Sequence, residues 1–88
     1  MMLKLREGFI LREVAGETVV IPSGDELDLN MMITLNETGR FLWERIAQGI
    51  EEADLVAALL AEYVVDEATA KAAVARFAAQ LRDKGFLI

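Results

Sequence analysis

The stretch from residue 31 to residue 46 changes from a β-type to a helical pattern, and this change constrains the fold most. Met31–Leu35 is a short apolar run with one polar interruption, which is typical of a strand. From Phe41 onward the apolar residues fall at helical spacing. The sequence therefore predicts a strand that passes directly into a helix.

Asn36 lies between the two patterns, where a helix N-cap is required. Its side-chain oxygen can accept a hydrogen bond from the backbone N–H of Thr38 or Gly39. We expect the helix to span about residues 37–48, with Gly49 as the left-handed residue that ends it.

Two β-branched, apolar segments precede the junction, at residues 9–14 and 18–22, and they flank Ala15-Gly16-Glu17. This arrangement predicts a hairpin, because Gly16 supplies the positive φ of a tight turn and Pro22 cannot extend a ladder. Since neighbours in sequence are usually neighbours in space, Met31–Leu35 completes a three-stranded antiparallel sheet.

Two further helices are predicted after the junction, over about residues 52–62 and 67–84. Glu51 is a poor cap for the first, and Asp66 is a good cap for the second. One narrow stripe of the last helix should face the core: Ala70, Val74, Phe77 and Leu81. Trp43 and Phe77 are expected in the core, and the apolar residues 86–88 should fold back onto it.

The length of 88 residues is that of one domain, so residues 1–88 are expected to form a single unit. Three strands followed by three helices is the element order of a winged-helix-like domain. The predicted fold class is therefore α+β, winged-helix-like, with a three-stranded antiparallel sheet followed by three helices.

The composition argues against catalysis. The chain has no histidine, no cysteine and a single serine, Ser23. Imidazole acid–base catalysis, thiolate chemistry and the usual zinc sites are therefore excluded, and a hydroxyl nucleophile activated by an imidazole cannot be assembled from this chain alone. We expect no catalytic residues, no metal and no cofactor, and hence a protein that is not an enzyme.

The charge distribution argues against nucleic acid as the main partner. The net charge is −6, and residues 16–66 carry eleven acidic and two basic residues. A winged-helix fold allows an alternative in which the last helix enters a DNA groove with its four basic residues: Lys71, Arg76, Arg82 and Lys84. A solvated helix face explains these residues as well.

Neither a signal peptide nor a membrane span is indicated, because the first residues are too charged and no apolar stretch is long enough. A cytoplasmic location, away from membranes, is expected.

Two weaker motifs have simpler explanations. Asp25, Glu26 and Asp28 could form a calcium loop, but no distal glutamate or Asp-x-Asp-x-Asp-Gly pattern completes it, which favours a solvated loop. Trp43 with Phe41 could mark a ligand pocket, although aromatic residues at helical spacing in a small domain are usually core.

Several segments together resemble one known family. They are Leu35-Asn36-Glu37-Thr38-Gly39-Arg40-Phe41-Leu42-Trp43-Glu44, Gly49, Leu59-Leu60-Ala61-Glu62-Tyr63, and Phe77-x3-Leu81-x3-Gly85-Phe86-Leu87-Ile88. In order and spacing the chain resembles the PqqD-like family over nearly its whole length. Glu51 departs from the family pattern, which often has Ser or Thr at this cap.

The resemblance implies a winged-helix-like peptide-binding module, often called a RiPP recognition element. Such a module holds the leader of a ribosomally made precursor peptide and presents it to a modifying enzyme, commonly a radical SAM protein. Related modules bind the leader as an added strand along the third β-strand, in a groove closed by the third helix. The pathway, quinone synthesis or another, does not transfer with the resemblance.

An open edge on the third strand would suit this role, because its unpaired backbone groups are a template for a visiting strand. The expected peptide-binding residues are Met31, Met32, Ile33, Thr34 and Leu35 on the strand, and Ala73, Arg76, Phe77 and Gln80 on the last helix. The opposite flank of that helix, with Lys71, Ala75 and Ala78, is the alternative. The strand could instead be central, or be covered in a homodimer.

Overall fold

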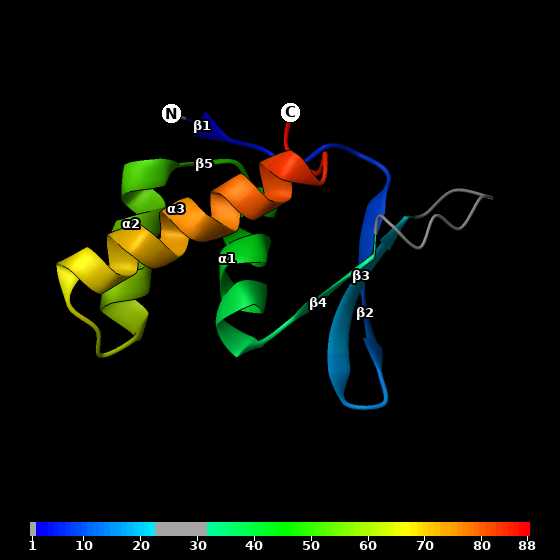
Figure 1. Ribbon diagram of the computed structural model, residues 1–88, viewed down its shortest axis with the longest axis horizontal. Helices are drawn as coiled ribbons and strands as arrows, with labels where there is room; N and C mark the ends of the chain where they lie inside the picture. Colours follow the sequence, from blue (N-terminus) through cyan, green and yellow to red (C-terminus); the bar gives the residue numbers. More distant parts are fainter. Residues whose placement is uncertain (1, 23–31) are drawn as a thin grey trace.

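The computed structural model describes residues 2–22 and 32–88, and it places a β-sheet beside a group of three helices (Figure 1). In chain order the elements are β1 (Met2–Leu3), β2 (Phe9–Val14), β3 (Glu17–Pro22), β4 (Ile33–Leu35), α1 (Glu37–Ala47), β5 (Ile50–Glu51), α2 (Glu52–Glu62) and α3 (Glu67–Asp83). The three-stranded antiparallel sheet and the three helices confirm the predicted α+β, winged-helix-like fold class.

The β2–β3 hairpin closes with a two-residue turn at Ala15 and Gly16. Both have positive φ, 52° and 83°, as a type I′ turn requires. Gly16 has the predicted role, whereas the positive φ of Ala15 was not predicted. Glu17 belongs to β3 rather than to the turn, and Pro22 ends β3 as predicted.

β4 is shorter than predicted and forms one edge of the sheet, whose strand order is β2-β3-β4. It begins at Ile33, so Met32 lies just outside it. Met31 and the acidic residues Asp25, Glu26 and Asp28 lie outside the described residues. Because β4 is at an edge of this strand order, the alternative in which it is central in the sheet is wrong.

α1 begins at the predicted cap: Asn36 Oδ1 accepts a hydrogen bond from Gly39 N at 2.7 Å. The helix ends at Ala47, one residue earlier than predicted. Gly49 has φ 78° and its N–H donates to Ile46 O at 2.9 Å, so it is the left-handed terminator that was expected.

α2 has the predicted bounds, and Glu51 makes no side-chain capping bond. α3 ends at Asp83, one residue before the predicted end. Its cap, Asp66, accepts a hydrogen bond from Thr69 N at 2.6 Å. A hydrogen bond from the Thr69 side chain, together with this backbone hydrogen bond, lowers the pKa of the Asp66 carboxyl.

A second, two-stranded sheet joins β1 to β5 and was not predicted. The segment after β1 also pairs with the C-terminus, through a bridge between Leu5 and Leu87 and a 3.0 Å hydrogen bond from Ile88 N to Lys4 O. Residues 4–6 and 86–88 therefore lie side by side, and β1 lies beside β5 (Figure 1). The expected fold-back of residues 86–88 is confirmed for Phe86 and Leu87, while the Ile88 side chain stays exposed.

The core lies between the sheet and the helices, and its largest fully buried side chain is Phe86. The Phe86 ring makes edge contacts with Phe9 and Trp43, at centroid distances of 4.6 and 5.5 Å. Trp43 is buried, as predicted. The prediction for Phe77 was wrong in part, because this side chain packs against the core but is only half-buried. Its exposed part borders a groove between β4 and α3.

Candidate functional site

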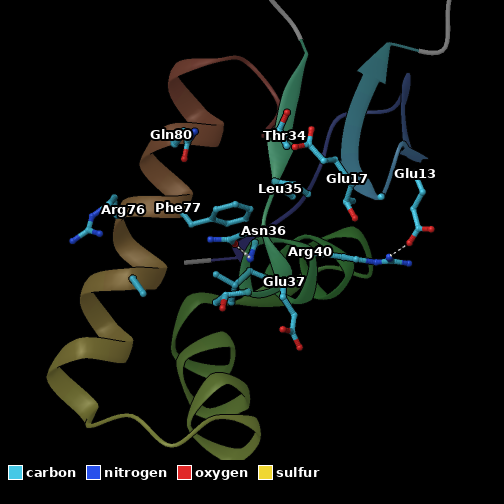
Figure 2. Close-up of a pocket in the computed structure, with 16 residues that line it drawn as sticks. Glu13, Glu17, Thr34, Leu35, Asn36, Glu37, Arg40, Arg76, Phe77 and Gln80 are labelled. Carbon is cyan, nitrogen blue, oxygen red and sulfur yellow. Dashed lines mark hydrogen bonds and ion pairs between the residues drawn. The ribbon is translucent and has the colours of Figure 1, made fainter.

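An open groove of about 840 Å³ separates β4 from α3 and continues past the end of β4 to the hairpin turn. Figure 2 shows α3 on one side, with Phe77 projecting from it toward Leu35 and Asn36. This volume is within the range of ligand sites in proteins, roughly 300–1,000 Å³. The groove is therefore the candidate functional site.

The hairpin fixes which backbone groups of the sheet face each neighbour. In a two-residue hairpin the pair that closes the turn, here Val14 and Glu17, exchanges hydrogen bonds, and bonded pairs then alternate with unbonded pairs. Val19 and Ile21 of β3 therefore bond to β2. Thr18 and Val20 turn their N–H and C=O groups the other way, toward β4.

The same alternation assigns the backbone groups of β4. Thr18 is opposite Leu35 and Val20 is opposite Ile33, so Leu35 and Ile33 bond to β3. Thr34 lies between them and turns its N–H and C=O outward, at the open edge. Among the strands that the structure describes, none pairs with this donor and this acceptor of Thr34, which face the groove.

The side chains of β4 follow the matching alternation. Ile33 and Leu35 are buried in the core, while the Thr34 side chain is exposed on the opposite face. An added strand that bonds to Thr34 would keep this alternation, so its residues on either side of the bonded one would turn toward the core side of the sheet. That is the side on which α3 stands.

The α3 wall of the groove is formed by four residues on one flank: Ala73, Arg76, Phe77 and Gln80. Ala73 and Phe77 are half-buried, and Gln80 is exposed. In Figure 2 Gln80 lies level with Thr34, and Arg76 projects away from β4. The surface that faces β4 is therefore apolar at Ala73 and Phe77 and polar at Gln80.

The far end of the groove is polar and is organised by Arg40 of α1. Its Nη1 donates to Glu13 Oε1 at 2.6 Å and its Nε to Glu44 Oε1 at 3.0 Å (Figure 2 shows the former contact). The hydrogen bonds to Glu44 and Glu13 raise the pKa of the Arg40 guanidinium above its ordinary value. Arg40 therefore links the hairpin to α1.

The structure brings six of the nine expected peptide-binding residues to one groove: Thr34, Leu35, Ala73, Arg76, Phe77 and Gln80. Ile33 is buried behind the groove, Met32 is half-buried but does not line it, and Met31 lies outside the described residues. The alternative flank of α3, with Lys71, Ala75 and Ala78, does not border the groove, and Ala78 is buried in the core.

The sequence-based prediction missed the residues that extend the groove past β4: Glu13, Gly16, Glu17, Thr18, Glu37, Thr38, Gly39, Arg40 and Leu42, with the cap Asn36. The signal that could have identified the hairpin residues is the length of the turn. A two-residue turn fixes the β2–β3 register, and this register turns the backbone groups of Thr18 away from β2, toward the strand on the other side of β3.

The basic residues of α3 do not form a common surface with this groove. Lys71 Nζ lies 3.0 Å from Glu67 Oε1, and of the three basic residues within α3 and the C-cap Lys84 only Arg76 borders the groove. Within residues 2–22 and 32–88, no helix is long and apolar enough to span a membrane. In the same ranges, no group of three acidic residues is placed to hold a metal ion.

Comparison with known proteins gives one family and two related folds. The family model "Coenzyme PQQ synthesis protein D (PqqD)" matches residues 17–87. The structure described as "TbiB1 in Complex with the TbiA(beta) Leader Peptide" has a TM-score of 0.76 and 23% identity, and the match covers 96% of this chain and 93% of that chain.

The second structure, "Lasso peptide synthetase B1 complexed with the leader peptide", has a TM-score of 0.77 and 21% identity. The match covers 98% of this chain and 96% of that chain. At these identities the two structures establish a shared fold. None of the curated proteins compared matches the chain.

Proposed function

Since the chain belongs to the PqqD family, we propose that it is a non-enzymatic peptide-binding module, a RiPP recognition element. It captures the leader of a ribosomally synthesised precursor peptide and presents the peptide to a modifying enzyme, such as a radical SAM protein. The two structures that share its fold are complexes with leader peptides, which supports a peptide as the ligand here.

The observation that carries the proposal is the outward-facing backbone of Thr34, at a sheet edge that no strand of the described residues covers, beside a groove whose opposite wall carries the half-buried Phe77. An edge strand whose N–H and C=O are free is a template for another strand. A leader that adds to β4 gains backbone hydrogen bonds from Thr34 and apolar contact from α3. Binding of this kind needs neither a metal nor a cofactor.

The direct test is an NMR titration of the ¹⁵N-labelled chain with synthetic leader segments of short precursor peptides encoded beside its gene. We expect the largest chemical-shift changes at Ile33–Leu35 and along α3 from Ala73 to Gln80. Shifts centred on α2, with β4 and α3 unmoved, would reject the proposed site. The oligomeric state is measured in the same samples, because a homodimer through β4 would compete with the peptide for the same edge.

A matched pair of variants isolates the backbone contribution. Thr34→Pro removes the outward N–H but no hydrogen bond to β3, and proline is tolerated on an edge strand. Thr34→Ala removes the side chain and keeps the N–H. We expect the proline variant to weaken binding by about tenfold, the effect of one or two hydrogen bonds, and the alanine variant to bind almost as wild type. Equal weakening by both variants would count against strand addition.

A further inference from the structure

The flank of α3 that faces β4 presents three different surfaces in succession. Along the helix they are Ala73, Phe77 and Gln80, three or four residues apart, so they lie in one row. From Ala73 to Gln80 the helix advances by seven residue steps, or about 10 Å. The row is small and apolar at one end, aromatic in the middle, and polar at the other end.

An added strand offers side chains to this row at a comparable spacing. Its residues that point to the core side are two positions apart, so three of them span about 13 Å. The difference of about 3 Å is within the reach of a side chain. Alternate residues of one short extended segment can therefore contact the three surfaces of α3.

Thr34 sets the register of that segment. Figure 2 places Gln80 level with Thr34, and Phe77 level with Leu35 and Asn36. The segment residue that bonds to Thr34 points away from α3, because Thr34 does so itself. Its neighbour on the Leu35 side meets Phe77, and its neighbour on the Ile33 side meets Gln80. The segment residue two positions further on, beyond the one that meets Phe77, also points inward and meets Ala73.

We infer that the chain recognises a five-residue extended segment with a large apolar residue facing Ala73, an apolar residue facing Phe77 and a polar residue facing Gln80, at alternate positions. This inference rests on the proposed function and names the peptide pattern that the same groove selects. Ala73 leaves room for a large side chain, Phe77 offers a ring face, and the Gln80 amide can donate and accept hydrogen bonds. The two intervening residues point outward and are not selected.

The test uses a displayed library of random nine-residue peptides, selected on the purified full chain. The expected result is enrichment of two apolar residues separated by one position, with a polar residue two positions further on. In a synthetic peptide of the selected sequence, aspartate at either apolar position should weaken binding by about tenfold or more. Changing the residue that pairs with Thr34 should alter the affinity by less than about threefold, since its side chain points to solvent.

Variants of α3 should change the selection position by position. With Gln80→Leu, the selected peptides should carry an apolar residue at the position that was polar. This substitution should not affect folding, because Gln80 is exposed. With Ala73→Leu, the selected peptides should carry alanine or glycine in place of the large apolar residue that faces position 73. If Ala73→Leu does not fold, Gln80→Leu alone decides, and selection unchanged by Gln80→Leu would overturn the inference.

Thr34→Pro separates failure of this inference from failure of the proposed function. Peptides that are enriched by the wild type, are lost with Thr34→Pro and lack the alternating pattern would overturn the inference and leave strand addition standing. If no enriched peptide depends on the Thr34 N–H, both the inference and strand addition to β4 are overturned.

Discussion

The two sheets differ in how the backbone groups near them are paired. Beside the β1–β5 sheet, Leu5 pairs with Leu87, and Arg6 N donates to Phe86 O at 2.7 Å. The chain ends thus cover this part of the molecule, and Leu3 and Phe86 are buried beneath them. In the β2-β3-β4 sheet, by contrast, no strand within residues 2–22 and 32–88 covers the edge at Thr34, which faces a groove.

This difference indicates that the paired segments around Phe86 stabilise the fold, whereas the sheet edge at Thr34 remains available for binding. Satisfied backbone groups around Phe86 lower the free energy of the folded state, whereas the free N–H and C=O of Thr34 are solvated and contribute nothing to folding. Substitutions at the two places should therefore separate stability from binding. Four predictions test this separation, in order of decreasing effect.

The largest effect is expected from Phe86→Ala. This side chain is fully buried between Phe9 and Trp43, so its truncation should lower the free energy of unfolding by about 3–5 kcal/mol. Phe77→Ala, at a half-buried site, should lower it by only about 1–2 kcal/mol, because part of the ring is already in water. Urea unfolding measures both values. Equal losses would mean that Phe77 is a core residue like Phe86.

The second prediction compares prolines at adjacent positions of β4. Ile33→Pro removes an N–H that bonds to β3 and leaves the Val20 carbonyl without its donor, which should lower the free energy of unfolding by about 1–3 kcal/mol. Thr34→Pro removes an N–H that faces the groove and should change stability much less. Thermal unfolding of the two variants checks the assignment, and the reverse order would show that the register has been assigned wrongly.

The third prediction concerns the cap at the end of β4. Asn36→Ala removes the acceptor for Gly39 N, and loss of such a cap lowers stability by about 1 kcal/mol. Asn36→Asp keeps an acceptor at the same place and serves as the control. Denaturant midpoints should fall for alanine and stay near wild type for aspartate. A normal midpoint for Asn36→Ala would mean that the cap does not hold the strand-to-helix junction.

The smallest effect is a pH dependence at the far end of α3. Hydrogen bonds from Thr69 lower the pKa of Asp66 below its ordinary value of 3.8. The stabilisation is therefore complete above that value and is lost as the pH falls through the lower, folded-state pKa. Asp66→Asn keeps an acceptor that does not titrate. The difference in Tm between wild type and Asp66→Asn should be constant near neutral pH and should shift against the wild type below pH 3.8.

Local chemistry made much of the fold predictable from the sequence. Asn36, Asp66 and Gly49 each determine a helix end through one hydrogen bond or one backbone angle, and all three are found as predicted. Pro22 likewise ends β3. Boundaries that depend on such residues can be read without knowledge of the tertiary structure.

The parts that could not be predicted depend on contacts between distant segments. β1 and β5 have two residues each, too few to show a periodicity, and they form by pairing with each other across a large separation in sequence. The open edge of β4 depends on strand order, which a hydrophobic pattern does not encode. The expected α3 residues do border the groove, but Phe77 could not be assigned to core or groove from spacing, because it lies where the two meet.

The burial of Trp43 has a practical consequence for measuring these properties. It is the only tryptophan of the chain, it is packed edge-on against Phe86, and it does not line the groove. Its fluorescence should therefore change when the core opens and stay nearly constant when a peptide without tryptophan occupies the groove. A single spectroscopic signal can thus report unfolding in the presence of ligand, without a label and without a contribution from binding itself.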